Sequence, residues 1–169
     1  DGTPNATLSE SLDHLQKLTK QFPVSSIRIL YPASGTRLCA CWIEDENVVI
    51  DKNAYWAPAR SVEEAAYVAA IINSQIVLDR VKDLQPVGQR DPRHFDNLVW
   101  TLPIPEFDET DSIHRELAEA ALHAADVAAG VALPGEAYFT TKRAIVRQVL
   151  SEDGVAETVE RLVDALLPG

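Results

Sequence analysis

The chain has 169 residues, of which 46% are hydrophobic and 24% are charged, as is typical of one globular domain. No stretch approaches the roughly 20 consecutive apolar residues that a membrane-spanning helix needs, so we expect no contact with a membrane. The net charge of -11 disfavours a protein that binds nucleic acid over most of its surface, because an acidic domain repels a DNA duplex. Any DNA-binding surface must therefore be local.

We expect a single domain, residues 1–169, that belongs to a larger protein, because the chain contains no Met, even at position 1. No charged segment followed by an apolar one begins the chain, so nothing indicates secretion. Cys39 and Cys41 are two residues apart on an expected strand, and such neighbours rarely form a disulfide. A cytoplasmic protein is the simpler interpretation. A zinc site is disfavoured, because it would need a second pair of ligands.

Region 1–25 is expected to form an amphipathic helix over residues 8–22. Thr7 and Glu10 have the spacing of a capping box, in which each residue binds the other's backbone amide. Pro23 would end the helix. The apolar stripe of this helix comprises Leu8, Leu12, Leu15, Leu18 and Phe22.

Region 26–107 is expected to begin with an antiparallel β-meander. Alternation and β-forming residues predict strands over 27–31, 36–43 and 48–50. The turns between them are rich in Pro, Gly, Asp and Asn. A meander followed by helices indicates an α+β fold.

The same region continues with a central helix over residues 61–82. Ser61 and Glu64 form a second capping box, and Ile72 and Ile76 belong to its apolar pattern. Because this helix is apolar on most sides, we expect it to be buried beneath the meander. Prolines then fix an extended backbone over 102–105.

Region 108–169 is expected to form a C-terminal helical hairpin or bundle. Helices are predicted over 113–131, from a cap at Thr141 to Leu150, and from Val155 to Leu166. The first has an apolar seam with coiled-coil spacing, which either packs within the chain or mediates self-association. The seam comprises Ile113, Leu117, Ala120, Ala124, Val127 and Val131.

Several pieces of the sequence resemble the C-terminal part of adenine-N6 DNA methyltransferases and of related type I and fused type II restriction–modification proteins. The segment 63–74 reads EEAAYVAAIINS, and a polar loop and the segment 95–108, FDNLVWTLPIPEFD, follow it. The resemblance covers roughly residues 26–130. It implies a region that follows the catalytic domain and helps the parent enzyme to recognise duplex DNA. S-adenosylmethionine would be a cofactor of that parent and not of this fragment.

Two polar loops carry the candidate DNA-binding residues. Thr36 and Arg37 lie at a predicted hairpin tip, and a second set follows the central helix. Arg and Gln side chains can make bidentate contacts with guanine and adenine. Solvated loops with no ligand are the alternative for each position. The second set comprises Gln89, Arg90, Arg93 and His94, whereas His14, His114 and His123 are expected to face solvent.

A second hypothesis assigns the chain to a different class of protein. In this alternative it is an acidic interaction or scaffold domain, whose helices over residues 111–167 bind another subunit and no DNA. The net charge favours this alternative, whereas the family pattern favours DNA recognition.

The sequence contains no catalytic motif of the resembled family. Adenine-N6 methyltransferases need an Asn/Asp-Pro-Pro-aromatic motif for the flipped adenine and a glycine-bearing turn for S-adenosylmethionine. Asp91-Pro92-Arg93 lacks the second proline. The acidic residues near Arg90 also lack the Glu-x-Lys spacing of a metal-dependent nuclease, so we expect no enzymatic activity.

We expect that the isolated chain neither methylates DNA nor binds S-adenosylmethionine, because both motifs are missing. The measurement is transfer of a labelled methyl group to duplex DNA. An adenine-N6 methyltransferase that retains its catalytic domain is the positive control. Label transferred by the isolated chain would show that the missing motifs were the wrong criterion.

Overall fold

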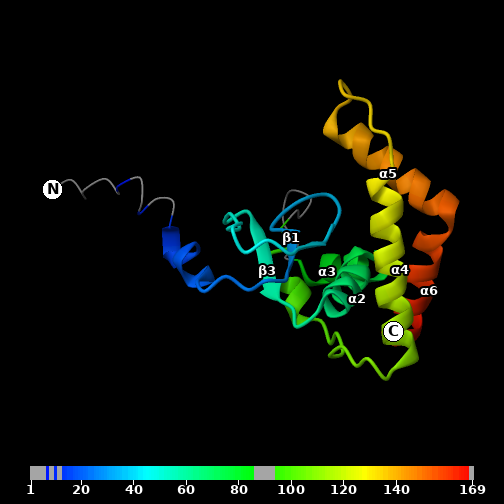
Figure 1. Ribbon diagram of the computed structural model, residues 1–169, viewed down its shortest axis with the longest axis horizontal. Helices are drawn as coiled ribbons and strands as arrows, with labels where there is room; N and C mark the ends of the chain where they lie inside the picture. Colours follow the sequence, from blue (N-terminus) through cyan, green and yellow to red (C-terminus); the bar gives the residue numbers. More distant parts are fainter. Residues whose placement is uncertain (1–6, 8–9, 11–12, 86–93, 168–169) are drawn as a thin grey trace.

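The computed structural model describes residue 7, residue 10 and the segments 13–85 and 94–167. Within them the fold is α+β, with a three-stranded antiparallel sheet, five α-helices and a helical C-terminal part, which confirms the predicted class. Figure 1 shows α2 and α3 between the sheet and the helices α4 and α6. The strands are β1 (Arg28–Pro32), β2 (Cys41–Ile43) and β3 (Ala54–Pro58). The helices are α2 (Val62–Asn73), α3 (Gln75–Leu84), α4 (Ser112–Ala129), α5 (Phe139–Asp153) and α6 (Val155–Leu166).

The sheet has the order β2-β1-β3, so its first strand is central. A simple meander would place the second strand in the centre, and the order therefore differs from the expected one. Ile29 of β1 lies opposite Trp42 on one side and Ala57 on the other. Ile29 and Tyr31 point into the core, as the alternation predicts.

The predicted strand over residues 48–50 is wrong, because a side chain and not a strand satisfies its backbone. The side-chain amide of buried Gln21 donates to the carbonyl of Ile50 (2.7 Å) and accepts from its N–H (2.8 Å). Val48 and Val49 are exposed. The third strand instead forms at β3.

Strand β2 is also shorter than the predicted 36–43. The side-chain amide of Asn73, at the end of α2, replaces a strand partner at Ala40. It accepts from the Ala40 N–H (2.7 Å) and donates to the Ala40 carbonyl (3.0 Å). This pair of bonds fixes the connection between β1 and β2 against the helix.

The predicted helix over residues 8–22 is wrong in its described part. Two short 3-10 helices, η1 (His14–Gln16) and η2 (Thr19–Gln21), replace it. Leu15 has a φ of 58°, in the left-handed region, which is incompatible with a continuous helix. Leu15 and Phe22 of the predicted stripe are exposed and Leu18 is partly buried, whereas Leu8 and Leu12 lie outside the described residues. The capping box itself forms, with the Thr7 N–H 2.8 Å from the Glu10 carboxylate.

The predicted central helix is two helices that meet at Ser74. The buried Ser74 hydroxyl accepts from the Val77 N–H (3.2 Å), which begins α3, and donates to the Ile71 carbonyl (2.8 Å), which ends α2. Serine is a favourable residue at the start of a helix, and Ser74 therefore begins a new helix here. The apolar pattern nevertheless continues across this break.

The second capping box, at the start of α2, forms with one of its two hydrogen bonds changed. Ser61 accepts from the Glu64 N–H (3.1 Å) as predicted. The Glu64 carboxylate reaches back to the Arg60 N–H (2.5 Å) and not to that of Ser61. The Arg60 guanidinium also binds it and holds the pKa of Glu64 below its usual value.

Helix α2 is the centre of the hydrophobic core, as its composition predicts. Ile72 is fully buried, and Ile76 of α3 is partly buried against the same core. Helix α4 covers much of α2, whereas the sequence predicted that the sheet alone would cover this helix. The fully buried residues of α2 are Ala65, Ala66, Tyr67, Ile71 and Ile72.

The seam of α4 packs within the chain, against α2 and α6. Leu117 is fully buried, and Ala120 is buried beside it. Helix α5 begins at Phe139, before the predicted cap at Thr141, and α6 spans the predicted range. No helix in the described segments combines the length and apolarity needed to cross a bilayer.

The expectation that His114 faces solvent is wrong. His114 is buried, accepts from the Asp108 N–H (3.0 Å) and lies against the Tyr67 ring. It shares the face of α4 on which Leu117 and Ala121 are buried, which explains its position. His123 is exposed, as expected, and lies 2.9 Å from Asp153. The side chain of His14 lies outside the described residues.

Candidate functional site

The hairpin tip and the segment that follows the central helices are joined in the structure. Ser34 forms an isolated antiparallel bridge with His94. The Phe95 N–H donates to the Ala33 carbonyl (2.8 Å), and the Gln85 side chain donates to the His94 carbonyl (2.6 Å). Two loops that are distant in sequence therefore form one edge, which we call the tip edge and define by residues 33–37 and 94–96.

Three of the six candidate DNA-binding residues lie on this edge. Thr36, Arg37 and His94 are all exposed. The other three, Gln89, Arg90 and Arg93, lie outside the described residues. In the sequence, Arg93 directly precedes His94.

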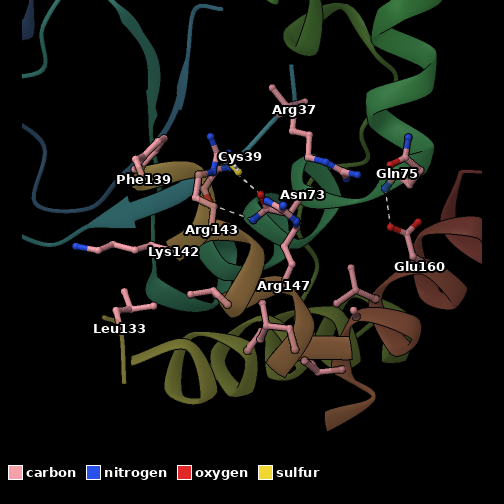
Figure 2. A pocket seen from close by; sticks show the side chains of 18 residues that line it. Arg37, Cys39, Asn73, Gln75, Leu133, Phe139, Lys142, Arg143, Arg147 and Glu160 are labelled. Carbon is pink, nitrogen blue, oxygen red and sulfur yellow. Dashed lines mark hydrogen bonds between the residues drawn. The ribbon is translucent and has the colours of Figure 1, made fainter. Parts of the chain in front are cut away.

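Arg37 also belongs to a second feature, a cavity of about 670 Å³ between the β1–β2 connection and helices α5 and α6. Figure 2 shows Arg37, Arg143 and Arg147 around the same space, with Phe139 and Leu133 towards one end and Glu160 towards the other. We call this cavity the α5 groove. Its apolar lining is Leu38, Ala40, Ala124, Leu133, Phe139, Val146, Leu150, Val155, Ala156 and Val159.

One face of α5 supplies more of the groove lining than any other element. Lining residues on this helix are spaced three or four apart, which places them on a single side. Gly154, with a φ of 87°, ends α5 in a left-handed conformation that glycine adopts without strain, and α6 follows at once. The face comprises Phe139, Lys142, Arg143, Val146, Arg147 and Leu150.

The groove is locally basic in an acidic protein. Its lining contains four cationic side chains, Arg37, Lys142, Arg143 and Arg147, against the single carboxylate of Glu160. Glu160 is already engaged, because it accepts from the Gln75 N–H (2.6 Å). The groove therefore has a positive potential that favours an anionic ligand.

The four cations differ in what holds them. Arg143 donates to the Cys39 sulfur and lies 5.1 Å from the centre of the Phe139 ring. Lys142 donates to the Gly135 carbonyl (3.0 Å). Arg37 and Arg147 form no hydrogen bond or ion pair with any residue that the structure describes. Their guanidinium groups are available for a ligand.

The sequence interpretation missed the cations of α5. A signal for them was present, because residues 137–151 contain three cationic side chains and no acidic one. Counting charge by predicted helix would have found this segment. Nothing in the sequence indicated that this segment lies near Arg37, because the Arg143–Cys39 contact joins residues 104 positions apart.

Anion binding is the chemistry that the two features support. Across the described segments, no group of three or more His, Cys, Asp or Glu side chains is placed to hold a metal ion.

Comparisons of the chain with models of protein families, with curated proteins and with solved structures give no significant match.

Proposed function

We propose that the chain is a non-catalytic C-terminal domain of an adenine-specific DNA methyltransferase or restriction–modification enzyme, and that it helps to bind or select duplex DNA. The parent enzyme would be cytoplasmic and would carry S-adenosylmethionine in a separate catalytic domain. The family resemblance of residues 26–130 and the geometry of the tip edge support this proposal.

The pairing of Ser34 with His94 is the observation that carries the proposal. It brings the two segments with candidate DNA-binding residues to one edge. The exposed Arg37 stands on that edge with no partner among the described residues. The scaffold on either side is rigid, since β1 and the buried Phe95 anchor it. Recognition residues are often placed on loops that a rigid scaffold positions.

The charge distribution agrees with a local contact. Lys142, Arg143 and Arg147 lie near Arg37 in the groove and add to the positive potential beside the tip edge. The rest of the domain is acidic, so the isolated chain is expected to bind DNA weakly, at or above the ~10⁻⁴–10⁻⁶ M of non-specific binding. The catalytic domain would supply the long-range attraction.

We expect replacement of Arg37, Arg90 and Arg93 by Ala in the parent enzyme to weaken DNA binding. A lost bidentate base contact should cost about 1–3 kcal/mol. A lost phosphate contact should instead lower the salt slope by about one and leave sequence preference unchanged. The measurement is a salt titration of the dissociation constant.

Arg161→Ala is the matched control for this test. Arg161 is an exposed cation of α6 outside the groove lining, so its removal changes the charge as much as the loss of any one of the three arginines but should leave DNA affinity unchanged. If the triple variant also shows unchanged affinity and salt slope, the tip edge is not part of a DNA interface.

One observation favours the alternative, an acidic interaction domain that contacts another subunit. Leu133, Tyr138 and Phe139 are 44%, 84% and 69% exposed around the start of α5. Clustered exposed apolar side chains mark protein interfaces more often than phosphate-binding surfaces. This feature lies in the α5 groove and on its rim.

A further inference from the structure

Helix α5 has an apolar face that the chain leaves largely uncovered. None of its 15 residues is buried. Most of the stability of a protein helix comes from packing of such a face. Phe139, Val146 and Leu150 of α5 line the groove together with Val155 and Val159 of α6. A ligand that fills the groove would bury this surface.

Cationic side chains stand among these apolar residues on the same helix face. Lys142, Arg143 and Arg147 occupy positions between Phe139 and Leu150. Duplex phosphates would neutralise the charges but leave the apolar floor exposed to water. The occupant must therefore be apolar and acidic at once.

We propose that the α5 groove docks an acidic amphipathic helix of a partner protein. Large apolar side chains of that helix enter between Phe139, Val146 and Leu150. Its Asp and Glu side chains pair with Lys142 and with the Arg147 guanidinium, which binds no other residue in the described segments. This is the helix-in-groove mode of recognition, and the cavity of about 670 Å³ accommodates several large side chains.

Single-stranded nucleic acid fits the groove less well. Such binding depends on aromatic rings with open faces on which bases stack. Phe139 is the single aromatic side chain in the groove lining, and the Arg143 guanidinium already lies over its ring. The floor otherwise consists of aliphatic side chains, which suit leucine-type residues.

A second copy of this chain lacks a suitable helix among its described residues. The acidic helix α4 buries Leu117 and Ala118 in its own core, and α6 buries Leu162 and Val163. Their apolar faces are thus already used. The proposal does not depend on DNA contact by the tip edge, and Arg37 is left unchanged in its test.

The test uses the 169-residue chain and a fluorescein-labelled designed peptide of about 15 residues, long enough to form a helix. The peptide has Leu at helical spacing and Glu on both flanks. We expect a saturable rise in fluorescence anisotropy that weakens as salt is added. A peptide with the same residues in scrambled order is expected to bind at least about tenfold more weakly, because it lacks an apolar face.

Two variants of the protein test the two halves of the proposal. Phe139→Ala removes an exposed apolar contact, and Arg147→Glu reverses an unpaired charge. Each is expected to weaken peptide binding about fivefold or more, as anchor residues do. Arg161→Glu makes the same charge change outside the groove and should have no effect. Circular dichroism melts confirm that each variant is folded.

Four outcomes would overturn the proposal. The designed peptide does not bind, or it binds both groove variants as tightly as the unchanged chain. Alternatively, duplex DNA displaces the peptide and Phe139→Ala leaves the affinity for the peptide unchanged, which indicates that the groove binds anions by charge alone. Finally, the chain dimerises in sedimentation and Phe139→Ala abolishes the dimer, which makes a second copy the occupant. Loss of peptide binding in both variants with retained DNA binding by the parent supports the proposal.

Discussion

Ile72→Ala is expected to lower the free energy of unfolding by about 2–5 kcal/mol. Ile72 is fully buried near the end of α2, in the core that this helix shares with the sheet and with α4 and α6. Truncation removes apolar surface from that core and leaves a cavity. Its neighbours Ile71 and Ala70 are buried too, so little flexible material can collapse into the space.

Urea denaturation of the two proteins measures this difference directly. Ile76→Ala is the control, because the same atoms are removed from a side chain that is only partly buried. We expect a smaller loss for Ile76. Equal stability of Ile72→Ala and the parent chain would show that α2 is not the centre of the core.

The central position of α2 could be predicted because it depends on composition within one segment. A run of alanines and isoleucines that leaves no polar face must be buried somewhere. The break at Ser74 was harder to predict, since the apolar pattern continues through it. Only the cap formed by the Ser74 hydroxyl divides the two helices.

The strands were less predictable because distant side chains decide where they end. Gln21 binds the backbone of Ile50, and Asn73 binds that of Ala40. These contacts join residues 29 and 33 positions apart. No local alternation of apolar residues contains that information. The predicted strand over 36–43 was therefore too long, and the one over 48–50 was misplaced.

One part of the candidate site could be predicted from local sequence, and the other part could not. Turn residues and an exposed cation indicated the hairpin tip locally, and the tip edge retains Thr36, Arg37 and His94. The α5 groove exists only because the chain folds back after α4 and places Arg143 against Cys39. A sequence pattern can indicate a basic helix but not which loop it will face.

Tyr67→Ala is expected to have an effect at least as large, a loss of about 3–5 kcal/mol. Tyr67 is fully buried in α2, and its ring centre lies 5.4 Å from that of Phe107 and 4.6 Å from that of His114. Its hydroxyl donates to the Pro105 carbonyl (3.2 Å). Burial raises the pKa of Tyr67 well above its usual value, so the hydroxyl stays protonated and keeps this bond.

The comparison with Tyr67→Phe separates packing from hydrogen bonding. Phe retains the ring contacts but loses the hydroxyl's bond to the Pro105 carbonyl and its longer contact with His114 Nε2 (3.4 Å). Loss of a hydrogen bond such as the one to Pro105 should cost about 0.5–1.5 kcal/mol. Both variants are measured by urea denaturation at the same pH. Similar losses for Ala and Phe would mean that the hydroxyl, and not the aromatic cluster, holds the proline-containing segment in place.

The aromatic cluster also lies against the start of α4, where the Asp111 side chain caps the helix. The Phe107 ring is tilted against that of Tyr67 and stacked with that of His114, and the Asp108 N–H donates to His114, in the first turn of α4. Tyr67→Ala should therefore loosen the join between α2 and α4 as well as the core. Since α4 supports α5 and α6, we expect the designed acidic peptide to bind more weakly to Tyr67→Ala and normally to Tyr67→Phe. Unchanged peptide affinity in a destabilised Tyr67→Ala protein would show that the groove is maintained without this cluster.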